Sequence, residues 1–376
     1  MSPAAVSTEL TAGQGALIIH WSDGTYGEFA SIWLRDNLPE DRDGHSGQRL
    51  IDVTDLPEEP RIRSATLVDA DLLINWQGED RSSIIKLDWL YSQCGAGAAE
   101  TALGPQPWLE GARLTAAGDF AWQSVGTLAT DTAARREWLK RLLQQGIAFL
   151  RDVPCIDSGI LDAMAPVGRV AETNYGLVFD VRAVPQPENL AYSDVGLGLH
   201  TDNPYREPVP GFQALHTLVA APDGGDNLFA DGWALAAHLR DTDPDSFAVL
   251  TRTAVPFRYR SREADLYAER PLISLDCSGS IVAVHYNSRS IAPLRLPAAD
   301  CRVFYAAYRR FGELLRERAF QLTTRMAEGD LVLFDNQRIL HGRTGFASAR
   351  HPRHLRGCYL TRDSVQSQAA LLQRLR

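Results

Sequence analysis

The sequence predicts an α+β protein that is mainly β, with a small β-rich module ahead of a larger domain. Three observations predict this class. The 376 residues exceed the usual size of one domain. Short strand-like runs separated by turn residues fill positions 16–90. Farther along, helical segments interrupt the strands without strict βαβ alternation, which favours an antiparallel or mixed sheet.

The N-terminal module opens with the strand-like run ALIIHW at 16–21 and a Ser-Asp-Gly turn at 22–24, which is a hairpin signal. A further strand is expected through 32–34, and the runs LIDV, ATLV, LLINW and SIIKL continue the pattern. The stretch 94–117 is rich in Gly, Ala and Pro and is the expected linker. We therefore place the two domains at 1–105 and 106–376.

The larger domain mixes helices and strands. A helix is expected from Thr130 to Gln145, because apolar side chains recur there at helical spacing and Gly146 stands at the stop position. Further helices are expected near 160–170, 233–239 and 300–318. The expected strands are IAFLRDV (147–153), AVPFRYR (254–260), IVAVHYN (281–287), LVLF (331–334) and LRGCYLT (355–361).

Composition excludes several classes of protein. Lys and Arg number 38 against 47 Asp and Glu, for a net charge of -9, which argues against nucleic acid or an anionic membrane as a partner. We find no signal peptide and no stretch of about 18 apolar residues, so we expect a cytoplasmic protein. The cysteines are scattered and odd in number, which argues against disulfides and a cysteine zinc site: Cys94, Cys155, Cys277, Cys301 and Cys358.

The segment LGLHTDNP holds the H-x-D pattern of His200 and Asp202. Along a strand, residues two apart share a face, so these side chains offer two metal ligands side by side. Gly198 on the same face leaves room beside a metal. One H-x-D pattern arises easily by chance among nine histidines, so a third ligand is the test.

His341 is the candidate third ligand, in LVLFDNQRILHGR. Two histidines and one carboxylate form the facial triad of non-haem Fe(II) oxygenases, although zinc hydrolases use similar ligands. Arg353, twelve residues later, favours the oxygenase, because a 2-oxoglutarate-dependent enzyme needs a fixed cation for the distal carboxylate of its cosubstrate.

These motifs resemble the taurine dioxygenase superfamily and, more narrowly, the γ-butyrobetaine and trimethyllysine hydroxylases. The resemblance rests on H-x-D followed by Asn-Pro-Tyr, on GGDN at 224–227, LHGR at 340–343 and RHLRG at 353–357, and on IWLRDN and GQRLID in the N-terminal module. It implies a double-stranded β-helix (jelly roll) oxygenase domain and a homodimer. Relatives often carry zinc-binding cysteines after the WLRDN motif, and this chain has none there, so we predict no structural zinc. Asp41, Asp43 and His45 stand in their place, and a solvated loop is the expected alternative to a weak metal site.

The resemblance also implies a pocket for a small zwitterion. An aromatic cage for a trimethylammonium group would consist of Tyr175, Phe179, Tyr192 and Tyr359. The anionic end would contact Asn189 and Asn287, joined here by Arg206 and Arg289. Two guanidinium groups would suit a phosphonate better than a carboxylate, unless they form structural ion pairs. Asn227 would lie near 2-oxoglutarate.

The predicted activity is hydroxylation that depends on Fe(II), 2-oxoglutarate and O2, with ascorbate as the reductant in vitro. The favoured substrate is 2-(trimethylammonio)ethylphosphonate, hydroxylated at C1, and γ-butyrobetaine is the alternative. A non-catalytic protein that binds quaternary amines and a zinc hydrolase are the alternatives from other classes.

Overall fold

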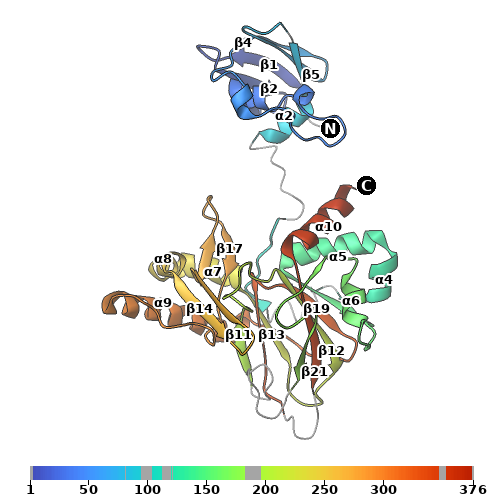
Figure 1. The fold of residues 1–376 in the computed structure, drawn as a ribbon, viewed down its shortest axis with the longest axis vertical. Coiled ribbons are helices and arrows are strands. Elements are labelled where there is room, and N and C mark those ends of the chain that lie inside the picture. Colours follow the sequence, from blue (N-terminus) through green and yellow to red (C-terminus); the bar gives the residue numbers. More distant parts are fainter. Residues whose placement is uncertain are drawn as a thin grey trace. The chain divides into compact units, whose positions relative to one another are not determined.

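The structure is a computed structural model that divides into two compact units, Met1–Ala102 and Leu103–Arg376 (Figure 1). It describes residues 3–80, 82–94, 104–111, 120, 122–182, 196–346 and 353–374. Each unit has its own hydrophobic core. Among helices in this described part, none combines the length and apolar character needed to cross a bilayer.

The N-terminal unit contains two three-stranded antiparallel sheets. The first consists of β1 (Ala5–Leu10), β2 (Ala16–Trp21) and β3 (Tyr26–Ala30), and the second of β4 (Ile62–Val68), β5 (Asp71–Trp76) and β6 (Ser82–Lys86). The helices are α1 (Ser31–Asp36) and α2 (Leu87–Gln93), with 3-10 turns at Pro39–Asp41 and Val53–Asp55. Alternate residues of β2 and β5 are buried, as expected for sheets with one face in a core.

The strand expected at 32–34 is wrong, because this segment belongs to helix α1. The helix buries Leu34 in the core and stacks Trp33 between Phe29 and Trp89. Arg35 then forms ion pairs with Asp41 at 2.5 Å and with Glu79 at 3.0 Å. These tertiary contacts override the strand preference of Ile and Trp.

The loop that lacks zinc-binding cysteines is held by protein groups. Asp41 pairs with Arg35, and the Asp43 carboxylate accepts hydrogen bonds from the backbone amides of His45 and Ser46 at 3.2 and 2.7 Å. These acids therefore have local partners, which supports the solvated-loop interpretation. The absence of zinc stays a prediction.

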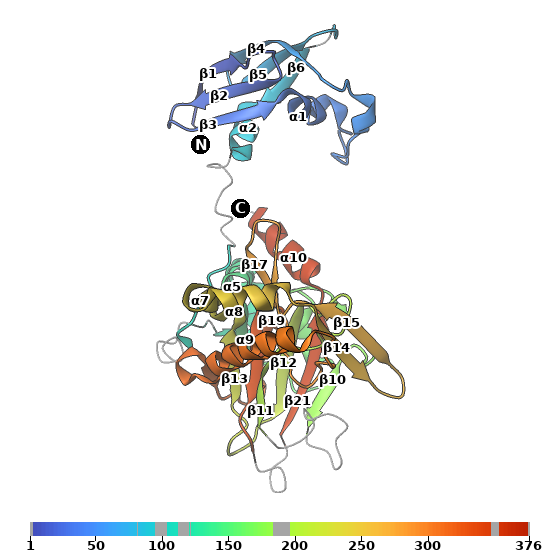
Figure 2. The same cartoon turned by 90° about the vertical axis from the view of Figure 1, so that its left-hand side faces the viewer.

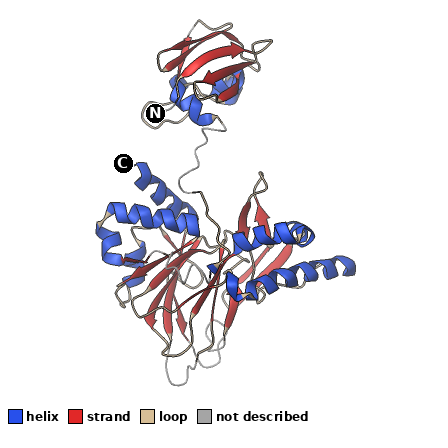
Figure 3. Ribbon diagram, turned by 180° about the vertical axis from the view of Figure 1, so that it is seen from behind, coloured by secondary structure: helices blue, strands red, loops and turns tan. Residues whose placement is uncertain are grey.

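The larger unit is a jelly-roll sandwich of two sheets, whose strands run through its centre in Figure 3. The seven-stranded sheet has the order β10-β21-β12-β19-β8-β7, with β9 beside β21, and the four-stranded sheet has the order β11-β20-β13-β18. The first contains β7 (Trp122–Ser124), β8 (Ile147–Arg151), β9 (Val170–Ala171), β10 (Phe179–Arg182), β12 (Phe212–Val219), β19 (Leu331–Asp335) and β21 (His354–Leu360). The second contains β11 (Leu197–His200), β13 (Asn227–Asp231), β18 (Leu322–Thr324) and β20 (Ile339–Arg343).

Helices cover the sandwich on both sides (Figure 1). One group packs on the seven-stranded sheet and consists of α4 (Val125–Thr130), α5 (Thr132–Gln145), α6 (Gly159–Met164) and α10 (Arg362–Arg374). The other group, at the front of Figure 2, consists of α7 (Gly232–Thr242), α8 (Pro244–Arg252) and α9 (Ala298–Arg316), which a 3-10 turn at Arg318–Phe320 follows. The hairpins β14 (Val255–Arg260) with β15 (Asp265–Arg270) and β16 (Ile273–Leu275) with β17 (Ile281–Val284) pack with this second group.

Alternation along the strands produces two apolar layers. In β19, Leu331 and Leu333 face the helices, while Val332 and Phe334 face the interior between the sheets. This is the period-two pattern of a strand that is buried on both faces. The interior layer closes one part of the sandwich and leaves the part near β11 and β20 for the site.

Most of the elements predicted in the larger unit are present. The helix predicted from Thr130 is α5, and Gly146 ends it in the left-handed region at φ 77°. The helix near 160–170 is shorter than predicted, and α8 and α10 were not predicted. The expected linker is wrong at Trp108, because this side chain is buried in the interior layer and its amide donates to Asp231 at 3.1 Å.

Candidate active site

The two candidate histidine ligands come from neighbouring strands. His200 ends β11 and lies opposite His341 of β20 in the antiparallel register. Their rings are 4.2 Å apart between centroids, and both side chains are buried. This close approach needs Gly342, because a Cβ atom there would lie 2.5 Å from the Leu197 carbonyl oxygen of β11. The glycine of the LHGR motif therefore lets the two strands bring the imidazoles together.

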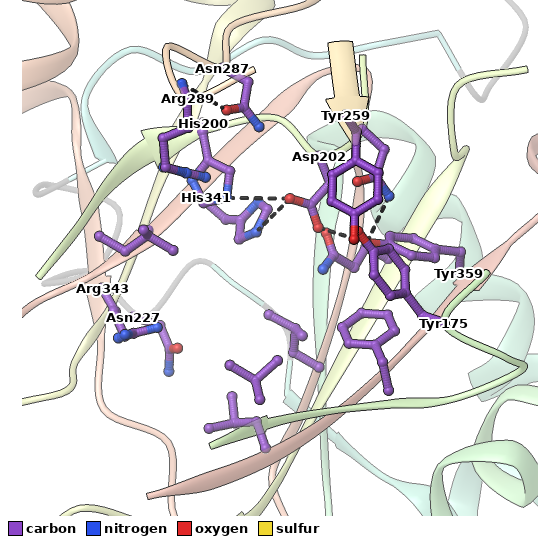
Figure 4. Close-up of a pocket in the computed structure, with 18 of the residues that line it drawn as sticks. Tyr175, His200, Asp202, Asn227, Tyr259, Asn287, Arg289, His341, Arg343 and Tyr359 are labelled. Carbon is purple, nitrogen blue, oxygen red and sulfur yellow. Dashed lines mark hydrogen bonds and ion pairs between the residues drawn. The ribbon is translucent and has the colours of Figure 1, made fainter. Parts of the chain in front are cut away.

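Asp202 completes the group just after β11 ends. Its Oδ1 lies 3.3 Å from His200 Nε2 and 3.9 Å from His341 Nε2. One ligand atom from each of the three residues lies within 4.8 Å of the other two (Figure 4). The structure thus brings together all three residues that the sequence nominated as metal ligands.

The chemistry of this donor set fits Fe(II). His200 Nδ1 lies 2.9 Å from the Gly198 carbonyl, which places the proton on Nδ1 and leaves the Nε2 lone pair for a metal. Burial lowers the pKa of His341 to about 3. Burial opposes the ionisation of Asp202, but His341, His200 and a hydrogen bond from Tyr359 outweigh it and hold the pKa of Asp202 well below its usual range. A neutral imidazole at His341 and an ionised Asp202 carboxylate are forms that bind metal.

Space for a further ligand exists beside the triad. A Cβ atom at Gly198 would meet no heavy atom within 4 Å, in line with the room expected there. The triad opens into a cavity in the sandwich. The lining residues are Tyr175, Phe179, Val181, Leu197, His200, Asp202, Asn203, Tyr205, Gln213, Leu215, Asn227, Tyr259, Asn287, Arg289, His341, Gly342, Arg343, Arg353, Leu355 and Tyr359.

One wall of the cavity is a continuous set of aromatic rings. Tyr175 lies 6.3 Å from Phe179 and 6.1 Å from Tyr259, and Tyr259 stacks on Tyr205 at 5.3 Å, between ring centroids. Phe179 lies 5.1 Å from Tyr359. Figure 4 shows Tyr175, Tyr259 and Tyr359 together on one side of Asp202. Ring faces gathered in one wall attract a cation without hydrogen bonds.

Arg353 and Asn227 lie together in the same cavity. Arg353 Nη2 donates to Asn227 Oδ1 at 2.9 Å, and both side chains are buried. Gly225 of the GGDN motif makes room for this arginine, because a Cβ atom there would lie 3.0 Å from Arg353 Cδ. Burial, together with the nearby Arg343 charge, lowers the pKa of Arg353 to about 10, so it remains a cation at neutral pH. A buried guanidinium in this place suits a dicarboxylate cosubstrate.

Of the described polar side chains expected at the substrate's anionic end, some line the cavity and others do not. Asn287 and Arg289 both line the cavity, and Asn287 is fixed by donating to the Thr201 carbonyl at 3.0 Å. Arg206 does not line it. Its guanidinium lies 5.8 Å from the Tyr175 ring centroid, and its Nε and Nη2 atoms are buried without a hydrogen-bond partner among the described residues, so a role for Arg206 at the anionic end stays a prediction.

Sequence reasoning missed several lining residues. Tyr205, Tyr259, Gln213 and Arg343 line the cavity without having been nominated. Tyr205 directly follows the H-x-D-N-P segment, and Arg343 is the last residue of LHGR, so both stood in quoted motifs. Gln213 and Tyr259 carry no local signal. The predicted Asn189 and Tyr192 lie outside the described residues.

Comparison with known proteins agrees with this geometry. Residues 112–359 match the taurine catabolism dioxygenase TauD, TfdA family, and residues 8–91 match the gamma-butyrobetaine hydroxylase-like N-terminal domain. Gamma-butyrobetaine dioxygenase of Pseudomonas sp. (strain AK-1) is 32% identical over 387 residues, which cover 100% of this chain and 97% of the relative. Human gamma-butyrobetaine dioxygenase is 28% identical, covering 97% of this chain and 96% of the relative.

Two other relatives are more distant. Mitochondrial trimethyllysine dioxygenase of Rattus norvegicus is 26% identical, covering 92% of this chain and 82% of the relative. A solved structure of asparagine oxygenase with Fe(II), 2S,3S-3-hydroxyasparagine and succinate is 20% identical, covers 63% of this chain and 80% of that chain, and has a TM-score of 0.48. Since the family match spans most of the larger unit and the Pseudomonas relative aligns along the whole chain, the chain belongs to the TauD/TfdA family and is an Fe(II)- and 2-oxoglutarate-dependent dioxygenase.

Proposed function

We propose that the chain hydroxylates a small zwitterion that carries a trimethylammonium group at one end and an anionic group at the other. The observation that carries this proposal is the aromatic wall beside Asp202. Fe(II) held by His200, Asp202 and His341 would supply the site where O2 is activated with 2-oxoglutarate as electron donor, and ascorbate would keep the iron reduced in vitro. The protein's own part is to aim one C–H bond at that site.

The cationic end of the substrate fits the aromatic wall. A quaternary ammonium has no N–H group to donate, so ring faces are its natural partners. Tyr175, Tyr205 and Tyr259 offer neighbouring ring faces, and burial raises the pKa of Tyr205 to about 12, so its hydroxyl stays neutral. Relatives named for γ-butyrobetaine and trimethyllysine support the same choice.

We propose a phosphonate as the anionic group, in 2-(trimethylammonio)ethylphosphonate hydroxylated at the carbon next to phosphorus. Arg289 supports this choice, because it is a guanidinium that lines the cavity near Asp202 and His341. The amide of Asn287 lies beside it (Figure 4). A guanidinium with an adjacent amide would match the several acceptor oxygens of a phosphonate. Arg206 contacts the Tyr175 ring of the cavity wall and is not among the lining residues, so the argument rests on Arg289.

γ-Butyrobetaine is the second candidate substrate. The whole-length relative at 32% identity is named for it, and one arginine beside an amide also suits a carboxylate. The two candidates share the cationic end and differ in the charge and shape of the anionic end. A direct competition between them therefore reports on the anionic end of the site.

The test supplies γ-butyrobetaine and 2-(trimethylammonio)ethylphosphonate together to the iron-loaded protein and follows both hydroxylated products with succinate. We expect the phosphonate to be consumed first. Arg289→Gln should reduce kcat/KM for the phosphonate by about 10- to 100-fold, the loss of one charge-assisted hydrogen bond, and should affect the carboxylate less. Preference for γ-butyrobetaine would reverse the substrate order.

The same assay separates the alternatives from other classes. A quaternary-amine binding protein would form no succinate, and a zinc hydrolase would need neither O2 nor iron. A cytoplasmic location and a homodimer through the N-terminal module remain predictions. Light scattering after size exclusion tests the dimer.

A further inference from the structure

Asp202 is fixed in two separate ways. Its backbone amide donates to Asn336 Oδ1 at 2.7 Å, and Asn336 Nδ2 donates back to the Asp202 carbonyl at 3.0 Å. Its carboxylate accepts a hydrogen bond from the Tyr359 hydroxyl at Oδ2, at 2.8 Å, while Oδ1 faces the two histidines. With the backbone clamped, the Tyr359 bond determines which carboxylate oxygen is left for a metal.

The Tyr359 hydroxyl belongs to a longer chain of hydrogen bonds. Asn203 Nδ2 donates to Tyr359 Oη at 3.1 Å, and Tyr205 Oη donates to Asn203 Oδ1 at 2.6 Å. The Tyr175 hydroxyl lies 3.5 Å from that of Tyr205. The direction of the chain is set at Asp202, because an ionised carboxylate only accepts. Tyr359 must therefore donate its proton there, and its oxygen can then accept from the Asn203 amide.

The backbone conformation of Asn203 directs its amide toward the Tyr359 hydroxyl. It adopts a left-handed conformation with φ 54°, is 5% exposed, and uses both ends of its amide in the chain. Asparagine tolerates this conformation better than most residues, and such conformations persist where surrounding contacts enforce them. The residue next to Asp202 is thus turned back toward Tyr359.

We propose that Asn203 is a positioning residue of the metal centre. It holds the Tyr359 hydroxyl on Asp202 Oδ2, so that Asp202 offers only Oδ1 to the metal and leaves the remaining coordination positions for the cosubstrates. Tyr359 then has two separable parts. Its ring lies against Phe179 in the cavity wall, and its hydroxyl serves Asp202. Loss of an outer partner that orients a ligand typically weakens metal affinity by about 10- to 100-fold.

The test measures Mn(II) affinity from the electron paramagnetic resonance signal of free Mn(II), without O2 or 2-oxoglutarate. Tyr359→Phe keeps the ring and removes the hydroxyl, and Asn203→Gly keeps the left-handed backbone and removes the amide. Each should weaken Mn(II) binding by about 10- to 100-fold. The double variant should be no weaker than the weaker single variant, because both changes remove the same restraint. Tyr308→Phe, a buried hydroxyl outside this cavity, is the matched control and should bind as the wild type does.

Three outcomes would overturn the role of Asn203. They are an unchanged affinity in Asn203→Gly, losses that add in the double variant, and an equal loss in Tyr308→Phe. If Asn203→Gly does not fold, Tyr205→Phe carries the test, since it removes the donor to Asn203 Oδ1, and an unchanged affinity there would refute the chain. Mn(II) binding is independent of the substrate proposal, so failure to turn over either zwitterion would leave this result standing.

Discussion

The metal end and the substrate end of the cavity are built on different principles. At the metal end, His200 and Asp202 have directional hydrogen bonds to Gly198, Asn336 and Tyr359. At the substrate end, ring faces from separate elements form the surface that a ligand would meet, while the hydroxyls of Tyr359 and Tyr205 are tied back toward Asp202 (Figure 4). Directional bonds fix one geometry, whereas ring faces and a single cation accept several related ligands. In this chain, a change of substrate would therefore require changes in the aromatic wall more than in the metal centre.

Asp202→Asn is the substitution that we expect to impair the metal site most. The amide keeps the size of the side chain but loses the anionic ligand and offers Tyr359 a different partner. We expect this variant to abolish substrate-dependent succinate formation, measured on iron-loaded protein. Asp265→Asn makes the same chemical change at an exposed ion pair with Arg258 and should leave the rate unchanged. Full activity in Asp202→Asn would refute the proposed ligand set.

Arg353→Lys probes the cosubstrate contact that adjoins the metal end. Lysine keeps the charge but cannot form two parallel hydrogen bonds, and it loses the geometry that Asn227 fixes. The KM for 2-oxoglutarate should rise by about 10- to 100-fold, which corresponds to about 1.5–3 kcal/mol. The control is Arg356→Lys on β21, the strand that begins directly after Arg353, where the arginine pairs with Asp180 and is not among the residues that line the cavity. An equal rise in both variants would show that Arg353 has no special contact.

Tyr259→Leu tests whether the substrate end depends on ring faces. Leucine keeps an apolar surface and removes the π-system. Only the binding of the cationic group should therefore weaken. We expect affinity for the trimethylammonium substrate to fall by roughly 5- to 30-fold, or about 1–2 kcal/mol, in anaerobic calorimetry. Affinity for 2-oxoglutarate should not change. Tyr267→Leu alters an exposed tyrosine of the partner strand β15 and is the control.

Arg206→Gln should have the smallest effect. Its guanidinium contacts the Tyr175 ring, and Arg206 is not among the residues that line the cavity, so the substitution removes a cation–π contact of about 0.5–1 kcal/mol. We expect kcat/KM for the phosphonate to change by less than about 5-fold, well below the effect of Arg289→Gln. A loss as large as that of Arg289→Gln would place Arg206 at the anionic end after all.

The sequence predicted the metal end far better than the substrate end. His200 and Asp202 occupy one short motif, and His341 and Arg353 follow within motifs that need no knowledge of the fold. Gly342 is part of the reason why the motif was recognisable. The close approach of β11 and β20 leaves no room for a side chain at this position, so the motif must contain glycine there.

The substrate end depends on register and on side-chain direction. Tyr259 reaches the cavity from hairpin β14–β15, and Gln213 reaches it from the central strand β12, so neither position could be identified before the sheets were assembled. Arg206 stands in the same motif as Tyr205, yet only Tyr205 enters the cavity. Similarly, helix α1 replaced an expected strand because Arg35 and Trp33 have long-range partners. In these cases tertiary contacts determine the secondary structure or the side-chain direction, which the local sequence pattern does not specify.

The hydrogen bonds of Asp202 join the two layers of the sandwich. Its histidine neighbours belong to the four-stranded sheet, whereas Tyr359 lies on β21 and Asn336 follows β19, both strands of the seven-stranded sheet. A metal ion bound at the triad would hold Asp202 in place and, through it, the hydrogen bonds that reach the seven-stranded sheet. Because binding to the folded state alone adds to stability, metal removal should loosen the sandwich as a whole as well as stop catalysis.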